Sequence, residues 1–349
     1  MFQLLLVILA LSVGFLLMKV GMILPWLFGP IIAAVLCSKF SRRTIVWPKV
    51  LGDLGLFILG AQIGAAFTRQ VVLDIKDDAV NIVILNMLLL AAAVLLSLLF
   101  KKIVDCTFET ALLSSIPGAL SQMIVMAEEN KQANLLVVTL SQTSRLLFVI
   151  MIVPLVSSWQ SGGVSHAAHK APSLFMQLSP LSFILLVLST AAVYRLMTKI
   201  HFPVPQLLAP ILVLIIWNMM TEQTFSIPYM LVALAQVLFG IRIGLQMYSL
   251  SNQLSRRLFV GICIHNLLLI GATLVMVIVF TWLTAHPFND LFLSAAPGGM
   301  AQIIVVGIET GANVAMISSY HIFRIFFILL IVTPLVQYIL KKSQIDKRL

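Results

Sequence analysis

Charge is scarce in this chain. Only 10% of its 349 residues are Asp, Glu, Lys or Arg, whereas about 25% of a typical soluble domain is charged. Hydrophobic residues make up 61%, and the mean hydropathy is +1.10. This balance excludes an ordinary soluble domain. It predicts an all-α integral membrane protein, because a spanning helix needs roughly 20 apolar residues and the chain has many such stretches.

Cysteine and clustered metal ligands are also lacking. The three cysteines, Cys37, Cys106 and Cys263, are far apart and form no CxxC motif, which excludes a disulfide framework. Of the six histidines, only His166 and His169 are close in sequence. A metal-dependent oxygenase needs clustered His and carboxylate ligands. We therefore expect no enzyme activity, no metal site and no cofactor.

The net charge of +10 does not indicate a nucleic-acid partner. The basic residues lie in short loops between apolar runs, where they mark cytoplasmic loops. No basic, aromatic-rich surface is present, and no polar stretch is long enough for a DNA-binding domain. The N-terminal apolar segment lacks a basic flank, so we interpret it as a transmembrane helix and not as a removable signal.

Apolar spans occur in two groups on either side of a polar stretch around Gly162, which is typical of a linker. We expect a first membrane repeat at 1–158, a linker at 159–178, and a second membrane repeat at 179–349 with a short basic tail. The predicted spans are 2–18, 22–38, 50–67, 79–100, 108–127, 135–158, 181–197, 205–219, 227–247, 258–282, 288–308 and 314–340.

The two groups repeat. A shift of 180 residues superposes rare residues that chance would hardly align, which indicates an internal duplication. The mid-span arginines Arg145 and Arg324 correspond after a slip of one residue. The matched pairs are Pro25 and Pro205, Pro30 and Pro210, Gly60 and Gly240, Gly64 and Gly244, Asn86 and Asn266, Pro117 and Pro297, Gly118 and Gly298, Gln122 and Gln302, Glu129 and Glu309, and Pro154 and Pro334.

Loop charges predict that the repeats have opposite orientations. The basic loop 39–49 corresponds to 220–226, which has no Lys or Arg; the acidic loop 74–78 corresponds to Arg256 and Arg257; and Lys101 and Lys102 correspond to 286–290. Inversion requires an odd number of crossings per repeat. We therefore expect about five transmembrane helices plus one Pro-Gly-broken re-entrant hairpin in each, with a broken spanning helix as the alternative. Both termini are then cytoplasmic, in a multi-pass protein of the cell membrane.

The broken segments are the first candidate binding site. Pro and Gly interrupt a helix, and freed backbone groups in a bilayer are tolerated where protein or a water-filled cavity surrounds them. Pro117 and Pro297 suit the first position of a second helical arm, with Ser115 as a cap. Two such N-termini would favour an anion; the alternative is a structural kink. The candidate residues are Ser114, Ser115, Pro117, Gly118, Ser121, Gln122, Ser294, Pro297, Gly298, Gly299 and Gln302.

The mid-span arginines are the second candidate. An Arg at a helix centre costs roughly 2.5–3.5 kcal/mol on insertion scales. Gln142 precedes Arg145 by three residues, and His321 precedes Arg324 by three, so each pair shares a helix face. We expect these faces to line a cavity where a guanidinium binds a substrate carboxylate. The alternative is a structural cation bonded to carbonyls that the helix breaks leave free.

Other polar residues carry weaker signals. Asn86 and Asn266 are expected to form interhelical hydrogen bonds, and the small residues at 60/64 and 240/244 to let helices pack closely. Glu129 and Glu309 follow the broken segments and are expected at the membrane interface, with gating as the alternative.

The segments SSIPGALSQM and SAAPGGMAQI, each followed by an Arg-bearing helix, resemble the duplicated AbrB-type membrane proteins over nearly the whole chain. Members carry labels such as ammonia monooxygenase or regulator of gene expression. The family is similar to the cation–proton antiporter and anion transporter group. That resemblance implies inverted five-helix repeats with discontinuous helices, but no established substrate.

These observations lead to an expected function. We predict a secondary transporter of a small anionic metabolite, a carboxylate or amino acid, working in the lipid bilayer by alternating access. Transport is either coupled to an ion, a proton or sodium, or facilitated without one, and an oligomer is compatible with the sequence. Two alternatives stay open: a membrane protein with a regulatory role on gene expression and no flux of its own, and a permease for a small neutral or amine solute.

Overall fold

The computed structural model describes residues 2–22, 24–41, 45–118, 120–130, 132–160, 179–202, 204–221, 225–251, 255–284 and 286–346. Every regular element in these ranges is a helix, so the all-α fold is confirmed for the described part of the chain. Most of the predicted linker lies outside the described residues, as do His166, His169, Arg42 and Arg43.

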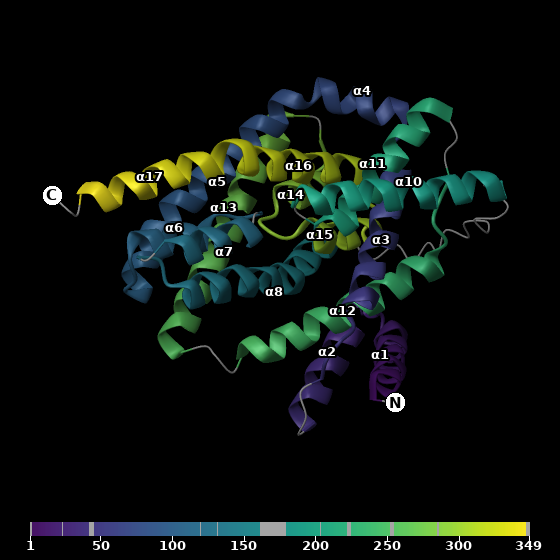
Figure 1. The fold of residues 1–349 in the computed structure, drawn as a ribbon, viewed down its shortest axis with the longest axis horizontal. Coiled ribbons are helices and arrows are strands. Elements are labelled where there is room, and N and C mark those ends of the chain that lie inside the picture. The colour runs from purple at the N-terminus through teal and green to yellow at the C-terminus, as the bar shows by residue number, and fades with distance from the viewer. Residues whose placement is uncertain are drawn as a thin grey trace. The chain divides into compact units, whose positions relative to one another are not determined.

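The helices follow the predicted spans closely (Figure 1). The first half contains α1 (Phe2–Lys19), α2 (Pro25–Phe40), α3 (Lys49–Ala65), α4 (Arg69–Asp77), α5 (Ala79–Val104), α6 (Phe108–Ser115), α7 (Leu120–Glu129) and α8 (Leu135–Gln160). The second half contains α10 (Pro180–Lys199), α11 (Pro205–Thr221), α12 (Tyr229–Ser251), α13 (Arg256–Leu283), α14 (Phe288–Ala295), α15 (Met300–Glu309), α16 (Val314–Phe327) and α17 (Thr333–Asp346).

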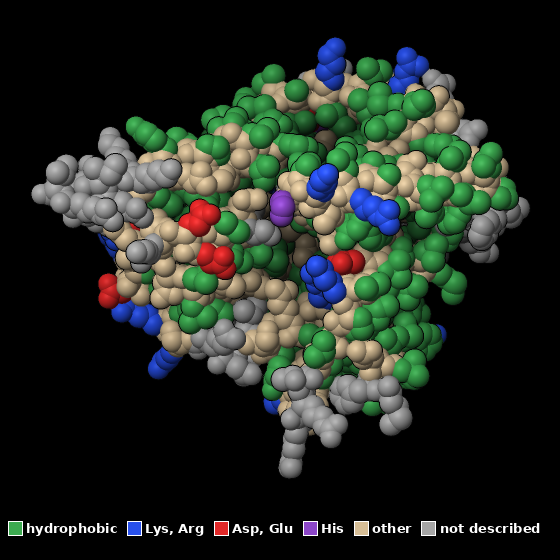
Figure 2. All heavy atoms as spheres, in the orientation of Figure 1, with side chains coloured by type: hydrophobic (Ala, Val, Ile, Leu, Met, Phe, Trp, Pro, Cys, Tyr) green, Lys and Arg blue, Asp and Glu red, His purple; other side chains and the backbone are tan. Residues whose placement is uncertain are grey.

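Six helices in the described residues are long and apolar enough to cross a membrane: α5, α8, α10, α12, α13 and the run from α16 into α17. Shorter apolar helices accompany them, among them α2, α11 and α15. Large hydrophobic side chains are exposed along these helices, such as Leu95 of α5 and Leu188 of α10. Hydrophobic side chains spread over the visible face in Figure 2, where charged ones are few. The chain is therefore a helical, multi-pass membrane protein.

Two local features were not predicted. Most of the acidic stretch 74–78, expected to be a loop, belongs to the nine-residue helix α4. A five-residue π-helix, Ile328–Val332, separates α16 from α17 and ends just before Pro334. Proline lacks the N–H of a regular helical hydrogen bond, so widening the preceding turn lets the helix continue past it. The two helices follow one another in Figure 1.

The chain forms two compact units, and each combines segments from both halves. Unit 1 comprises 1–77, 161–252 and 304–315, and unit 2 comprises 78–160, 253–303 and 316–349. Each compact unit therefore takes segments from both sides of the predicted linker at 159–178, and the repeat boundaries at 158 and 179 stay a prediction. Both Pro-Gly breaks and both mid-span arginines fall in unit 2.

Reciprocal glycine contacts hold unit 1 together. A Cβ placed on Gly60 of α3 would lie 2.6 Å from Cγ of Pro210 in α11. A Cβ on Gly240 of α12 would lie 3.1 Å from Cβ of Pro30 in α2. These two contacts are related by the same shift of 180 residues that relates the sequences. The predicted close packing at these glycines is confirmed, because no larger residue fits without moving the partner helix.

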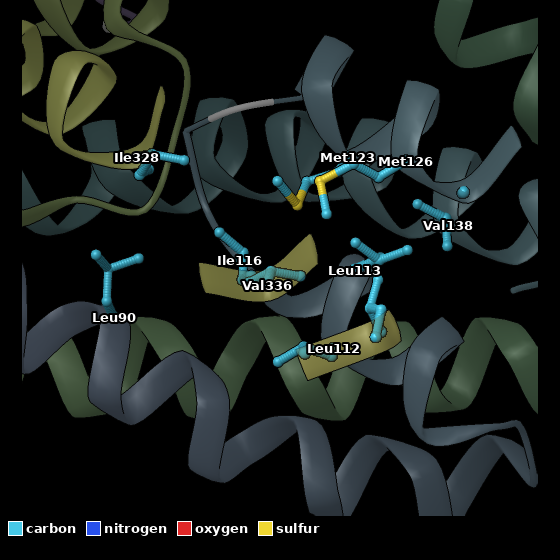
Figure 3. Close-up of a cluster of buried hydrophobic side chains, with 11 residues drawn as sticks. Leu90, Leu112, Leu113, Ile116, Met123, Met126, Val138, Ile328 and Val336 are labelled. Atoms are coloured by element: carbon cyan, nitrogen blue, oxygen red, sulfur yellow. The ribbon is translucent and has the colours of Figure 1, made fainter. Parts of the chain in front are cut away.

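Unit 2 has an apolar core around the first broken segment (Figure 3). Its buried residues come from α5, α6, α7, α8 and α17, and include Leu90, Leu112, Met123 and Val336. Ile328 of the π-helix also belongs to this cluster. Because α6 and α7 have 8 and 10 residues, each is too short to cross a bilayer alone. They are held by packing against longer helices instead.

Candidate functional site

Both predicted helix breaks are present. Between α6 and α7 the chain leaves the helix at Ile116 and re-enters it at Leu120, and between α14 and α15 it leaves at Ala296 and re-enters at Met300. The prediction that Pro117 and Pro297 start the second arms and that Ser115 caps the first is wrong, because α7 begins at Leu120 and α15 at Met300. Pro117 lies within the break, and the Ser115 hydroxyl donates to the Ala111 carbonyl, 2.8 Å away inside α6. Gly118 reverses the chain with a φ of +99°, so α7 begins only after that turn.

The first broken segment turns back on itself. Oγ1 of Thr107, the N-cap of α6, donates a 2.8 Å hydrogen bond to the carbonyl of Gln132, which follows α7. The backbone N–H of Asn134 donates to Oγ1 of Thr110 at 2.9 Å. The start of α6 and the end of α7 therefore meet, as in a re-entrant hairpin and unlike a helix that continues through the membrane. The same geometry for the second broken segment stays a prediction.

Arg145 binds the carbonyls of the first break. Its Nη1 donates to the Ser115 carbonyl at 2.8 Å, and its Nη2 donates to the Ile116 carbonyl at 3.0 Å. Nη2 also bonds Oε1 of Gln142, one turn earlier on α8. The Gln142 amide in turn donates to Leu113 and Ile116. The shared face of Gln142 and Arg145 thus satisfies the backbone groups that the break leaves free.

Arg324 does the same for the second break. The guanidinium, which is 1% exposed, donates from Nη1 to the Ala296 carbonyl at 2.7 Å and from Nη2 to the Ser294 carbonyl at 2.8 Å. His321, one turn earlier on α16, lies with Nε2 3.0 Å from the Leu293 carbonyl. The 180-residue shift relates the Ile116 carbonyl to that of Ala296, and it relates the Ser114 carbonyl, 3.5 Å from Nη1 of Arg145, to that of Ser294.

The two breaks meet through the second arginine. A Cβ on Gly118 would lie 3.2 Å from Cδ of Arg324 and 3.2 Å from Cδ1 of Ile328. Conversely, a Cβ on Gly298 would collide with Val149, one turn beyond Arg145 on α8. Each break therefore packs on the arginine helix of the other half. The Arg324 side chain touches the first break while its head group bonds the second.

Positive charge accumulates where the breaks meet. The hydrogen-bond partners of Arg145 and Arg324 are neutral carbonyls and amides, and among the described residues neither guanidinium has a carboxylate within salt-bridge distance. The two guanidinium groups also interact electrostatically with each other. Two like charges buried together with neutral partners favour a nearby anion. This chemistry suits a carboxylate, which accepts several N–H donors at once.

The other predicted residues occupy varied environments. Ser114 and Ser294 are buried, and their hydroxyls have no hydrogen-bond partner in the described part of the chain. Gln302 is buried, Gln122 and Gly299 are half-buried, and Gly118 is exposed. Pro117, Pro297 and Gly298 are buried within the breaks. The side chain of Ser121 lies outside the described residues.

Asn86 of α5 binds the second arginine, a partner that the sequence did not reveal. The predicted interhelical hydrogen bond of Asn86 is confirmed, because its Oδ1 accepts from Nε of Arg324 on α16 at 2.7 Å. Its counterpart Asn266 is buried with an amide nitrogen that has no partner among the described residues. The sequence showed that Asn86 and Asn266 are polar residues at matching positions of two apolar spans. It did not show that Arg324 is the partner of Asn86.

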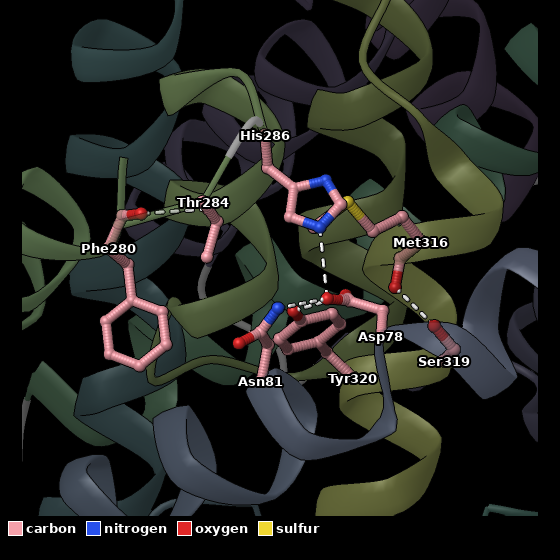
Figure 4. A network of polar contacts seen from close by, with 8 residues as sticks. All are labelled: Asp78, Asn81, Phe280, Thr284, His286, Met316, Ser319 and Tyr320. Carbon is pink, nitrogen blue, oxygen red and sulfur yellow. Dashed lines mark hydrogen bonds and ion pairs between the residues drawn. The ribbon is translucent and has the colours of Figure 1, made fainter. Parts of the chain in front are cut away.

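A polar network near the second arginine was also missed (Figure 4). The buried carboxylate of Asp78 accepts from the Tyr320 hydroxyl at 2.6 Å and from the Asn81 amide at 2.6 Å. Nε2 of His286 lies 3.0 Å from the same carboxylate. Tyr320 precedes Arg324 by one turn on α16, so this network fixes the helix that carries the guanidinium.

Comparison with known proteins gives a family and two relatives. The AbrB family, described as "Transition state regulatory protein AbrB", matches residues 26–340, a range that contains both breaks and both arginines. The "Uncharacterized protein YhjN" of Bacillus subtilis (strain 168) is 24% identical over 345 residues, covering 92% of this chain and 88% of that protein. The "Putative regulator AbrB" of Escherichia coli (strain K12) is 25% identical over 328 residues, covering 92% and 91%.

Proposed function

Since this chain belongs to the AbrB family, we propose that it is a secondary transporter that moves a small anionic metabolite, a carboxylate or an amino acid, by alternating access. The proposal assigns it no catalytic role and no nucleic-acid partner. The bound partners are the metabolite, the lipid bilayer and a coupling ion.

The observation that carries the proposal is the meeting of two helix breaks at a buried guanidinium. Of the five N–H donors of an Arg, Arg324 directs three into the bonds to Asn86, Ser294 and Ala296. Two donors are left for a ligand. The unpartnered hydroxyls of Ser114 and Ser294 add polar groups beside the same carbonyl-bonded segments. Discontinuous helices of this kind typically line the substrate sites of secondary transporters.

The membrane topology is part of the proposal. Nε of Arg257, at the start of α13, donates to the Ile103 carbonyl at the end of α5 with a length of 2.9 Å. The end of α5 and the start of α13 therefore lie on the same side of the membrane. Four crossings between them, one each by α8, α10, α11 and α12, give this result. A fifth crossing by the α6–α7 hairpin would put the two ends on opposite sides. If the second broken segment is also a hairpin that does not cross, each half has five crossings and the repeats are inverted. The proposal then puts both termini in the cytoplasm of a cell-membrane protein. Reporter fusions at either terminus test this orientation.

A regulatory role is the second candidate, because the E. coli relative is named a regulator. In this form the protein would influence gene expression without flux of its own. The two candidates are related if a transported metabolite is itself the signal. Flux measurements distinguish them, since a regulator without flux shows neither saturation nor counterflow.

The experiment starts from ligand binding. Purified protein is screened by thermal shift against small carboxylates, amino acids and amines, because a ligand that binds only the folded state raises the melting temperature. Stabilising compounds are then tested for uptake into proteoliposomes. Saturable uptake with counterflow of a carboxylate supports the proposal. Stabilisation by amines alone favours the permease alternative.

A further inference from the structure

Glu309 is buried, although the sequence placed it at the membrane interface. It is the last residue of α15, the helical arm that begins after the second break, and it is 6% exposed. The ionisable side chain of a membrane protein is costly to bury and usually has a function in binding or moving ions. Its counterpart in the first half, Glu129, is exposed at the end of α7.

Gln236 of α12 faces this carboxyl group in unit 1. Its side chain is 0% exposed, and its Nε2 donates to Oε1 of Glu309 at 3.1 Å. Its other polar atom, Oε1, is buried and has no hydrogen-bond partner in the described residues. An unsatisfied buried acceptor costs the desolvation of that atom. A donor is therefore missing at this point in the structure.

The protonation state of Glu309 decides whether that donor exists. An ionised carboxylate only accepts hydrogen bonds, whereas a protonated one carries an O–H donor. A carboxylic acid and a primary amide form a cyclic pair, in which the amide N–H donates to the carboxyl oxygen and the acid O–H donates to the amide oxygen. The observed bond is one half of that pair. A proton on Oε2 of Glu309 would complete it at Oε1 of Gln236.

We propose that Glu309 and Gln236 form a proton-binding site. The proton comes from water, binds Oε2 of Glu309, and neutralises the carboxylate without any other covalent change. The first half has no equivalent pair, because the residue that corresponds to Gln236 is Leu56, which has no amide to bond a carboxylic acid. This site names the proton as the coupling ion of the proposed transport. The coupling role therefore rests on the proposed function.

Charged and titratable groups lie on α12 and on the helices packed against it. Tyr229, also on α12, interacts electrostatically with Glu309. Arg242 of α12 and Asp53 of α3 bond each other at 3.2 Å. In the described parts of α1, α2 and α3, which pack on α12, the other charged side chains are the exposed lysines Lys19, Lys39 and Lys49.

Infrared difference spectroscopy tests the site without transport. Purified full-length protein in lipid nanodiscs is compared between mildly alkaline and mildly acidic buffer, and the carbonyl band of protonated carboxylic acids is followed. We expect a band that shifts in deuterated buffer, is lost in Glu309→Gln, and is retained in Glu129→Gln. In Gln236→Leu the frequency of this band should shift, because the O–H of Glu309 loses its acceptor, Oε1 of Gln236. Glutamine mimics the neutral acid, so Glu309→Gln should fold.

The outcomes separate this inference from the transport proposal. A band that is unchanged in Glu309→Gln, or a loss of the same band in Glu129→Gln, overturns the proton site even if the protein transports a metabolite. A band assigned to Glu309 in a protein without flux keeps the proton site and overturns its coupling role. Sodium-dependent changes in place of pH-dependent ones would also contradict the proposal.

Discussion

Nε of Arg324 donates a 2.7 Å hydrogen bond to Oδ1 of Asn86, which lies 238 residues earlier in the chain. The bond joins α16 of the second half to α5 of the first, inside unit 2. Because the same guanidinium bonds the second helix break and touches the first, Asn86 fixes the orientation of the group that connects them. The polar site is therefore built from both halves.

Removing this guanidinium should destabilise the protein strongly. In Arg324→Ala the carbonyls of Ser294 and Ala296 and the amide of Asn86 lose their partner while buried. We expect the free energy of unfolding to fall by about 3–5 kcal/mol, which is typical of breaking a buried charged network. In the control Arg257→Ala, where Arg257 pairs with the exposed Asp105, we expect less than about 1 kcal/mol. Thermal unfolding in detergent measures both. Equal melting temperatures would contradict the role assigned to Arg324.

The turn at Gly118 should not accept a side chain. Its positive φ costs an L-residue about 1–2 kcal/mol, and a Cβ would press on Arg324 and Ile328. Gly21 is the control, because it also has a positive φ, yet a Cβ there would have nothing within 4 Å. We expect Gly118→Ala to lower the melting temperature more than Gly21→Ala. A larger effect at Gly21 would argue against contact between the first break and Arg324.

The glycine contacts of unit 1 predict that Gly60→Ala is destabilising and that Gly271→Ala is not. Gly60→Ala would place a Cβ 2.6 Å from Pro210, and overpacking of this kind costs about 1–3 kcal/mol. Gly271 lies in α13, and a Cβ there would have nothing within 4 Å. Gly271→Ala should be neutral or stabilising by up to about 1 kcal/mol, because alanine favours helices. Thermal unfolding compares the pair. Tolerance of both substitutions would exclude close packing of α3 on α11.

The Asp78 network should contribute measurably to stability. Tyr320→Phe removes the hydroxyl that donates to the Asp78 carboxylate at 2.6 Å, and hydrogen bonds to charged groups contribute about 1.5–3 kcal/mol. Tyr338 of α17 is exposed, so Tyr338→Phe should change stability by less than about 0.5 kcal/mol. If chemical unfolding gives the same free energy for both variants, the network is not structural.

Rare residues allowed both helix breaks and both buried arginines to be predicted. Pro117, Gly118 and their counterparts marked the breaks, and Arg145 and Arg324 were conspicuous in apolar helices. Their contacts were not predictable, because Asn86 and Arg324 meet only after folding. Burial of Glu309 was hidden for the same reason, since its partner Gln236 is on a separate helix. The two compact units were not predictable from the sequence either, because each combines segments from both halves of the chain.

Transport by the reconstituted protein tests the central claim most directly. A carboxylate or amino acid that stabilises the protein in the thermal screen is supplied to proteoliposomes containing the wild type or Gly118→Ala. A secondary transporter predicts saturable uptake with counterflow in the wild type and reduced uptake in the variant, because the meeting point of the two breaks is altered. Uptake no greater than that of protein-free liposomes for every stabilising compound would contradict the account.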